Sequence, residues 1–348
     1  MFDFLNTVRE GVRRRASDIH LSSGNRPACR VDGTICFFDG PLLTPEEVEP
    51  CIRLCLDAER YKTFRKTGDM DAAVELEDCG RFRLNAFRQN LGPALALRII
   101  GAHPPELAEL NLPESIRRIL TLKSGLVLVT GPTGSGKSTT LAALIHEFNQ
   151  TQHCHIITVE DPIEYLHTPI QCVVSQREIG TDSASYARAL RAALREDPDI
   201  LLVGEMRDLE SISIAVTAAE TGHLVLSTLH TIGAANTIDR LVDVFPPEQQ
   251  QQIRTQLSMA LKSVISQRLL PARGGHGRAA AFEIMFVNNA IGNLIREGRT
   301  ANLSQIIETG ASAGMISMDK SIRGLLQNGV IDRSAAEEYS ASTAQSMR

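Results

Sequence analysis

The 348-residue sequence contains no tryptophan, and aromatic residues make up only 4% of the chain. Proteins that stack single-stranded bases need aromatic surfaces, so this composition argues against such a binder. A net charge of -5 also argues against a general nucleic-acid-binding protein, because those proteins present a basic surface. We therefore expect no nucleic-acid partner.

Long apolar runs and paired cysteines are also missing. No run approaches the roughly 20 apolar residues that a membrane helix needs. The N-terminal stretch MFDFLNTVREGVRRRASD lacks the apolar centre of a secretory signal. The 7 cysteines form no CxxC pair, and Cys51 and Cys55 lie in an apolar helical pattern that favours buried thiols. We expect a cytoplasmic protein whose contact with a membrane passes through a partner.

The length predicts two domains, because one hydrophobic core seldom serves so many residues. Residues 1–100 read as a small α+β domain built on an antiparallel sheet. Asp32 and Gly33 form a hairpin signal between short strands. Thr44 and Glu47 form a capping box around Pro45 at the start of a helix. A proline-rich linker follows over residues 101–115.

Residues 116–272 have a different hydrophobic pattern from the first 100 residues. SGLVLVTG, HIITVED, DILLVGE and HLVLSTLH are continuously apolar segments separated by helical stretches, which is typical of a parallel sheet buried on both faces. From residue 247 onward the sequence predicts a helix through residue 270, and residues 273–348 are predicted as a C-terminal helical part. The apolar stripe of that helix consists of Ile253, Leu257, Leu261, Val264 and Ile265.

The segment GPTGSGKST at 131–139 matches the phosphate-binding loop G-x-x-x-x-G-K-[ST], between a predicted strand and a predicted helix. Its glycines let consecutive N–H groups face the phosphates of ATP at a helix N-terminus. The lysine reaches the β- and γ-phosphates, and the first hydroxyl after it ligates Mg²⁺. The predicted binding residues are Gly131, Pro132, Thr133, Gly134, Ser135, Gly136, Lys137, Ser138 and Thr139.

Carboxylates follow two further predicted strands. Glu205 ends DILLVGE, where an acid beside the loop strand holds Mg²⁺ directly or through water, or polarises the attacking water. ITVEDPIEY contributes Glu160, Asp161 and Glu164, which would repel one another unless a cation or a basic group lay between them. Each of these three acids is alternatively a structural cap.

Two histidines flank the apolar segment LVLSTL. His223 begins this predicted strand and His230 follows it, so both are expected to project at a strand tip toward the γ-phosphate. A zinc site would need a third ligand at suitable spacing, and the neighbouring sequence offers none. A role linked to the nucleotide is favoured, and purely structural histidines are the alternative.

GPTGSGKST, ITVEDPIEY, ILLVGEMRD and TGHLVLSTLHT together resemble the Walker A, Asp box, Walker B and His box of the type II/type IV secretion ATPase superfamily. The chain is most similar to the branch that retracts type IV pili, and the resemblance covers nearly all of it. AIGNLIREG resembles the AIRNLIRE element of that branch, with Gly292 in place of an arginine. The related secretion and pilus-assembly ATPases carry a tetracysteine zinc module, and RLLPARGGHGRAAAFEIM has no cysteine.

The resemblance implies a RecA-like P-loop ATPase domain preceded by a smaller PAS-like domain over residues 1–100. It implies that Glu205 is the catalytic glutamate, Glu164 the Asp-box acid, and His223 and His230 the His-box residues. It also implies that arginines of the first domain close on the phosphates, with Arg81, Arg83 and Arg98 as candidates; surface ion pairing is the alternative for each.

Members of this family act as hexameric rings, so the resemblance implies a Mg²⁺-dependent ATPase motor that acts on an inner-membrane platform protein at the pilus base. Its output would be pilus disassembly, twitching motility or DNA uptake. An accessory ATPase that joins a paralogous pilus ATPase stays open as an alternative, because Gly292 departs from the family. A nucleic-acid motor is the second alternative, which a DNA-stimulated ATPase activity would favour.

Overall fold

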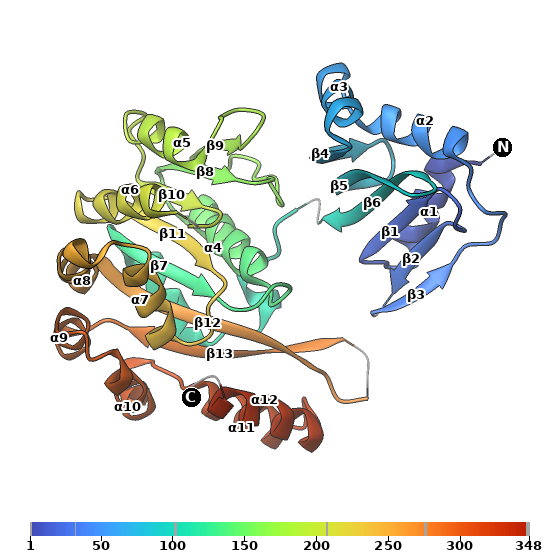
Figure 1. Ribbon diagram of the computed structural model, residues 1–348. Helices are drawn as coiled ribbons and strands as arrows, with labels where there is room; N and C mark the ends of the chain where they lie inside the picture. The colour runs from blue at the N-terminus through green and yellow to red at the C-terminus, as the bar shows by residue number, and fades with distance from the viewer. Residues whose placement is uncertain (1, 32, 101–102, 207, 275–276, 346–348) are drawn as a thin grey trace. The chain divides into compact units, whose positions relative to one another are not determined.

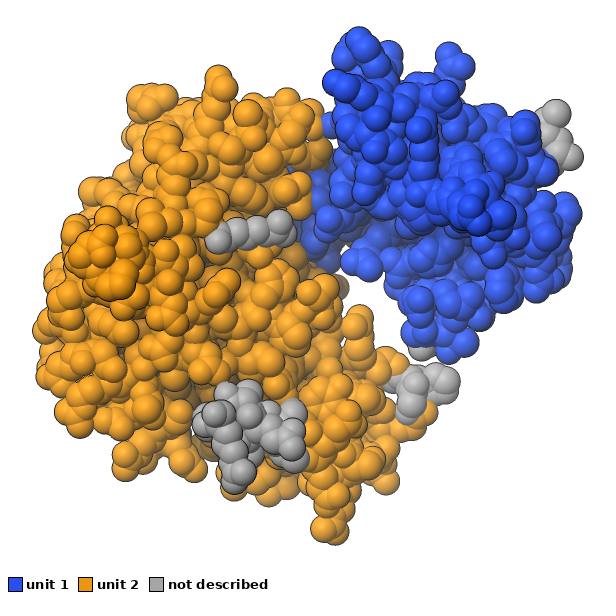
Figure 2. Space-filling model, viewed as in Figure 1, with its two compact units in different colours: residues 1–103, 162–166 blue, residues 104–161, 167–348 orange. Residues whose placement is uncertain are grey.

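A computed structural model describes residues 2–31, 33–100, 103–206, 208–274 and 277–345, with side chains through residue 340. The chain divides into two compact units by its internal contacts (Figure 2). The N-terminal unit comprises residues 1–103 and 162–166, and the second unit comprises residues 104–161 and 167–348. Each unit has its own hydrophobic core, as expected for a chain of this length.

The N-terminal unit contains a six-stranded sheet in the order β3-β2-β1-β6-β5-β4, and every neighbouring pair is antiparallel (Figure 1). The predicted hairpin is confirmed, since Val31 pairs with Thr34 across a two-residue turn. Gly33 has the positive φ that this turn requires, and Asp32 lies outside the described residues. The strands are β1 Asp18–Ser22, β2 Ala28–Val31, β3 Thr34–Phe37, β4 Asp69–Leu76, β5 Gly80–Gln89 and β6 Gly92–Ile100.

Three helices accompany this sheet: α1 Phe4–Arg13, α2 Pro45–Cys55 and α3 Ala58–Thr67. The helix predicted after Thr44 is confirmed, and the Glu47 carboxylate accepts a hydrogen bond of 3.0 Å from the Thr44 N–H. Burial of Cys51 and Cys55 raises the pKa of these thiols to about 11 and about 12. Both cysteines lie in the hydrophobic core of the unit.

The second unit contains a seven-stranded sheet in the order β13-β12-β7-β11-β10-β8-β9. All neighbours are parallel except β12 and β13, which form an antiparallel pair. The strands are β7 Gly125–Thr130, β8 His155–Glu160, β9 Val173–Glu178, β10 Ile200–Val203, β11 Leu224–Leu229, β12 Leu261–Pro271 and β13 Arg278–Phe286.

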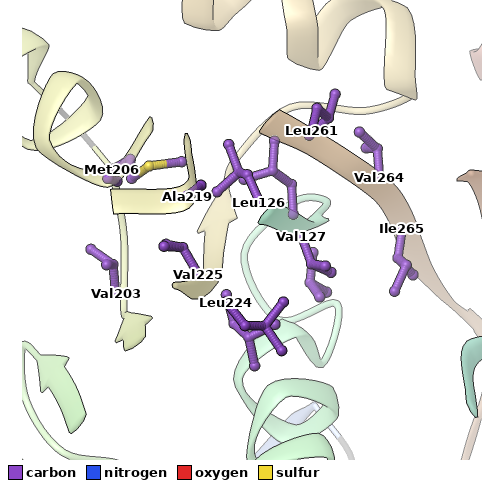
Figure 3. Packing of buried hydrophobic residues seen from close by; sticks show 14 of the residues in the cluster. Leu126, Val127, Val203, Met206, Ala219, Leu224, Val225, Leu261, Val264 and Ile265 are labelled. Carbon is purple, nitrogen blue, oxygen red and sulfur yellow. The ribbon is translucent and has the colours of Figure 1, made fainter. Parts of the chain in front are cut away.

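The central strands are buried on both faces, as their continuously apolar sequences predicted. Figure 3 shows Leu126 of β7 beside Ala219, while Val127 is directed to the other side of the strand. The helices of this unit are α4 Lys137–Thr151, α5 Tyr186–Ala193, α6 Leu209–Glu220, α7 Ala234–Asp243, α8 Pro247–Ala260, α9 Asn289–Glu297, α10 Leu303–Thr309, α11 Met318–Gln327 and α12 Arg333–Gln345. Short 3₁₀ helices are η1 Leu107–Leu110, η2 Glu114–Thr121, η3 Thr300–Asn302 and η4 Gly310–Ala313.

The predicted helix over residues 247–270 is wrong in its second half. Helix α8 ends at Ala260, and Leu261 begins β12, which lies between β7 and β13. Val264 and Ile265 are β-branched and fully buried, which suits a strand packed on both faces. Periodicity alone does not separate a buried strand from a buried helix. Residues 273–348 are likewise not entirely helical, because β13 pairs with β12.

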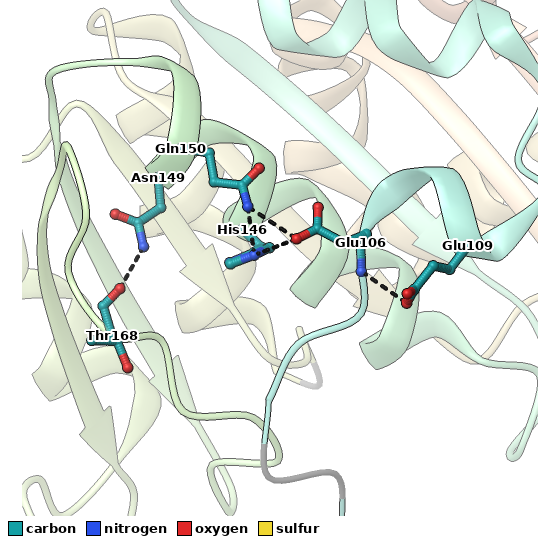
Figure 4. A network of polar contacts seen from close by, with 6 residues as sticks. All are labelled: Glu106, Glu109, His146, Asn149, Gln150 and Thr168. Atoms are coloured by element: carbon teal, nitrogen blue, oxygen red, sulfur yellow. Dashed lines mark hydrogen bonds and ion pairs between the residues drawn. The ribbon is translucent and has the colours of Figure 1, made fainter.

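The predicted linker is partly built into the second unit. Figure 4 shows Glu106 beside α4. Its carboxylate contacts His146 Nε2 at 3.2 Å and accepts a hydrogen bond of 3.0 Å from Gln150 Nε2. Asn149 of the same helix donates 2.8 Å to the Thr168 carbonyl. Residues 101–102 lie outside the described residues, and the sequence-based domain boundaries remain a prediction.

Candidate nucleotide-binding site

Four parallel strands bring the predicted site residues to one edge of the sheet. β7, β11, β10 and β8 run in the same direction, so the segments after their carboxyl ends lie along a common edge. These segments carry the phosphate-loop sequence, His230, Glu205 and Asp161. The expectation that the Glu205 strand adjoins the loop strand is wrong, because β11 lies between β7 and β10.

The loop from Gly131 to Gly136 connects β7 to α4. All three of its glycines have positive φ, the conformation that glycine tolerates best. A Cβ atom on Gly131 would lie 2.2 Å from the Gln267 carbonyl oxygen, and one on Gly136 would lie 2.8 Å from Gln267 Nε2. Backbone curvature and close packing against β12 therefore both require glycine here.

Lys137 opens α4 and folds its ammonium group back over the loop. Its Nζ donates a hydrogen bond of 2.9 Å to the Gly131 carbonyl and one of 3.0 Å to the Pro132 carbonyl. The side chain is buried. Ser138 and Thr139 follow in the first turn of the helix. The first N–H groups of a helix have no partner within the helix, so this end attracts anions.

Two buried hydroxyl groups beside the loop also lack protein partners in the described part of the chain. These are Oγ1 of Thr130, the last residue of β7, and Oγ of Ser135 in the loop. Buried polar atoms are normally hydrogen-bonded, so these groups indicate a site that accommodates a polar ligand. Backbone N–H groups, an ammonium group and the Ser138 hydroxyl form a donor set that fits a magnesium-bound triphosphate.

Glu205 and His230 meet after their strands end. Glu205 Oε1 lies 3.3 Å from His230 Nε2, and the Glu205 side chain is 20% exposed. A Cβ on Gly204 would lie 3.1 Å from the Tyr186 hydroxyl oxygen, so glycine allows the chain to pass close to its neighbours before the carboxylate. The sequence identified both residues, and the fold brings them into contact.

The acids of ITVEDPIEY are separated. Glu160 ends β8 and accepts a 2.7 Å hydrogen bond from Thr158 Oγ1, whereas Asp161 is exposed. Glu164 belongs to residues 162–166, which group with the N-terminal unit. A role for Glu164 at the nucleotide therefore remains a prediction.

His223 lies at the opposite end of β11 from His230. Leu224 pairs with Gly125 at the start of β7, and Leu229 pairs with Thr130 at its end. The His223 ring Nδ1 lies 3.0 Å from the Ala218 carbonyl oxygen. The expectation that both histidines project at one strand tip is therefore wrong within a single chain, because a strand separates its two flanking residues.

The three predicted arginines lie on one face of the N-terminal sheet. Arg83 and Arg98 are paired across β5 and β6, and Arg81 shares their face through strand alternation. Arg98 Nε lies 2.9 Å from Asp18 Oδ1 in a partly exposed ion pair. Contact of these arginines with a nucleotide remains a prediction.

Sequence reasoning missed the contribution of the β12–β13 hairpin. Gln267 accepts a 2.8 Å hydrogen bond from Thr140 Oγ1. Arg278 Nη1 donates a hydrogen bond of 3.4 Å to the Gly134 carbonyl oxygen. Arg268 is buried next to the loop. The apolar segment SVISQRLL, which contains Gln267 and Arg268, suits a helix as well as a strand, so its sequence does not indicate that these residues lie beside the loop. A pocket of about 490 Å³ opens here, between residues Pro132 to Ser135, Arg268, Leu269, Arg278, Glu338 and Tyr339.

Comparison with known proteins identifies the family of the chain. The family model described as type II/IV secretion system protein matches residues 3–313. The chain belongs to this family. The chain is 48% identical to the type IV pilus retraction ATPase PilT of Pseudomonas aeruginosa, over 97% of both chains. It is 35% identical to the type IV pilus ATPase PilU of the same organism, over 94% of this chain and 86% of PilU.

A solved structure supports the fold. The crystal structure of the pilus retraction motor PilT with bound ADP superposes with a TM-score of 0.89 at 45% identity, covering 97% of each chain. The predicted fold class, an α/β secretion-ATPase core with a smaller N-terminal domain, is confirmed. No helix within the described ranges has the length and apolar character to cross a membrane.

Proposed function

We propose that this chain is a Mg²⁺-dependent ATPase motor that powers retraction of type IV pili. One observation carries the proposal: a complete phosphate-binding loop lies at the same sheet edge as a contacting glutamate and histidine. The similarity to PilT along almost the whole chain supports the specific task.

In this proposal, Lys137 and the N–H groups of the loop bind the β- and γ-phosphates. Ser138 and Glu205 hold Mg²⁺, directly or through water, and Mg²⁺ supplies charge neutralisation when it is bound. Glu205 orients the attacking water and accepts its proton, while His230 positions that carboxylate through the 3.3 Å contact. In this scheme the loop binds the phosphates, whereas the carboxylate and the imidazole activate the attacking water.

The motor would act as a homo-hexamer on the cytoplasmic side of the inner membrane, where a platform protein at the pilus base receives the force. Nucleotide binding would change the relative position of the two units, with Arg81, Arg83 and Arg98 as candidate contacts from the N-terminal unit. The downstream effects would be pilus disassembly, twitching motility and DNA uptake.

Substitution of Lys137 tests the enzymatic part. Lys137→Ala should abolish ATP hydrolysis and leave the circular dichroism spectrum that of a folded protein, because the lost ammonium group contacts the loop rather than the hydrophobic core. Lys123→Ala is the matched control, since Lys123 is an exposed lysine before the amino end of β7. Full hydrolysis by the Lys137 variant would refute the loop assignment.

The cellular task has its own test. Deletion of the gene should give cells with excess pili that do not retract, and a gene encoding Lys137→Ala should not restore retraction. Unchanged pilus number and retraction would contradict the motor role.

An accessory ATPase, of the kind represented by PilU, is the second candidate. Gly292 favours it, because the retraction branch has an arginine at this position, and an added Cβ here would lie 3.1 Å from the Ser258 carbonyl oxygen, so a side chain would require a small shift between α8 and α9. An accessory role predicts that the purified chain hydrolyses ATP appreciably only when mixed with a paralogous ATPase. Strong hydrolysis by the chain alone would favour the motor.

A further inference from the structure

The helix α12 lines the same pocket as the phosphate-binding loop, although more than 190 residues separate them in sequence. Glu338 and Tyr339 form one side of this pocket, and residues Pro132 to Ser135 form the other. A volume of about 490 Å³ lies within the range of pockets that enclose a ligand of nucleotide size. The pocket therefore extends from the phosphate-binding loop to Glu338 and Tyr339 of α12.

The charges along the pocket give it a direction. Arg278 lines it next to the loop, where its guanidinium donates to the Gly134 carbonyl close to the N-terminus of α4, so this region attracts phosphate groups. Glu338 lines the α12 side, where its carboxylate repels phosphate groups and accepts hydrogen bonds from hydroxyl or amino groups. A triphosphate bound at the loop would therefore direct its uncharged end toward α12.

Contacts hold α12 in place on this side. Arg268 Nη1 donates 3.3 Å to the Tyr339 carbonyl, so β12 is bonded directly to the helix. Ala335 and Ala336 are buried in a small apolar cluster that also contains Leu270 of β12. The helix is thus packed against the hairpin that borders the loop.

We propose that Tyr339 and Glu338 bind the nucleoside part of the triphosphate whose phosphates Lys137 and the loop bind. Tyr339 presents an aromatic surface to the base, and Glu338 accepts hydrogen bonds from ribose hydroxyls or from an exocyclic amino group. This inference rests on the proposed ATPase function and adds the residues that distinguish a nucleotide from a bare polyphosphate. The C-terminal helix is then part of the binding site.

Calorimetry with two ligands tests the proposal on the full-length chain. Tyr339→Leu should weaken binding of ATP by about tenfold, the effect expected when base stacking is lost. It should leave the affinity for inorganic tripolyphosphate unchanged, because tripolyphosphate has no base. Tyr339→Phe should bind ATP within about twofold of the wild type, since the aromatic ring is kept.

Leucine at position 339 keeps the apolar contact with the cluster around Leu270 and thereby preserves the helix. Neighbouring glutamates provide a matched pair of variants. Glu338→Gln should weaken ATP binding, whereas Glu337→Gln should not, because Glu337 is exposed and bonds to Arg333 at 2.7 Å.

Unchanged ATP affinity in Tyr339→Leu would overturn the proposal while leaving the ATPase assignment intact. An equal loss of affinity for ATP and tripolyphosphate would also overturn it, because the tyrosine would then support the loop rather than the base. If the wild-type chain bound neither ligand, the proposed function itself would fail.

Discussion

Glu205 Oε1 and His230 Nε2 lie 3.3 Å apart, each just beyond the carboxyl end of one of two adjacent parallel strands. The strands β10 and β11 fix this distance, since their paired residues end together at Val203 and Ser227. The carboxylate and the imidazole therefore form a unit at the sheet edge that also carries the phosphate-binding loop.

This relationship predicts separate effects on binding and turnover. Glu205→Gln should retain ATP binding, because the loop and Lys137 are untouched, and should lower kcat by at least about 100-fold through loss of the general base. His230→Ala should lower kcat to a smaller extent with similar ATP affinity. Steady-state hydrolysis and calorimetric titration measure the two quantities.

His153→Ala is the control for the histidine variant, because His153 is exposed and precedes the amino end of β8, away from the loop. Normal hydrolysis by Glu205→Gln would place the catalytic carboxylate elsewhere. Glu164 would then be the next residue to test.

His167 should make the stability of the fold depend on pH. The side chain is buried, and burial lowers its pKa from 6.5 to about 4 by penalising the charged ring. The unfolded chain binds the proton below pH 6.5, so stability is fully present above that pH and falls as pH decreases toward 4. The expected loss between about pH 7.5 and pH 5 is on the order of 2 kcal/mol.

Denaturant unfolding at these two pH values measures the effect. His167→Leu should reduce the pH dependence by about that amount, whereas His153→Leu should leave it unchanged, because His153 is exposed. An equal pH dependence in wild type and His167→Leu would contradict the assignment.

The thiol of Cys154, which contacts the thiol of Cys172, should resist alkylation at neutral pH. Their sulfur atoms lie 3.3 Å apart, and burial together with this contact raises the pKa of Cys154 to about 12. Only the thiolate reacts, so the rate at Cys154 should rise steadily as pH increases toward 12. Mass spectrometry after timed iodoacetamide treatment of the folded chain follows each cysteine.

Cys36 serves as the internal reference, because it is only half-buried, at the edge strand β3. It should be alkylated well before Cys154. Labelling of Cys154 as fast as Cys36 near pH 7 would show that the pair is not packed as described.

Two helical glycines should respond oppositely to alanine. Gly324 in α11 has open space around its added Cβ, so Gly324→Ala should raise the free energy of unfolding by about 0.5–1 kcal/mol through helix propensity. Gly292 in α9 faces the Ser258 carbonyl oxygen at 3.1 Å, so Gly292→Ala should give no gain or a loss. Thermal melting compares the variants, and equal stabilisation by both would refute the close packing of α8 and α9.

Much of the local structure could be predicted from patterns among residues that are close in sequence. The glycines of GPTGSGKST, the capping box at Thr44 and the Gly33 turn depend on neighbouring residues, and each appears where the sequence indicated. The apolar strands were recognisable because burial on both faces leaves no polar alternation. The helix prediction for the region from Leu261 to Pro271 was wrong, because an apolar run of this length suits either a helix or a buried strand.

The sequence by itself determined the phosphate-binding loop, the apolar strands and the identity of the chemical groups, because those features follow from local geometry and residue type. Only the tertiary structure decided which groups meet. Strand order placed His230 beside Glu205 and left His223 at the far end, and the β12–β13 hairpin brought Arg268, Arg278 and α12 to the loop. Such contacts depend on pairing between distant segments, which no local pattern encodes.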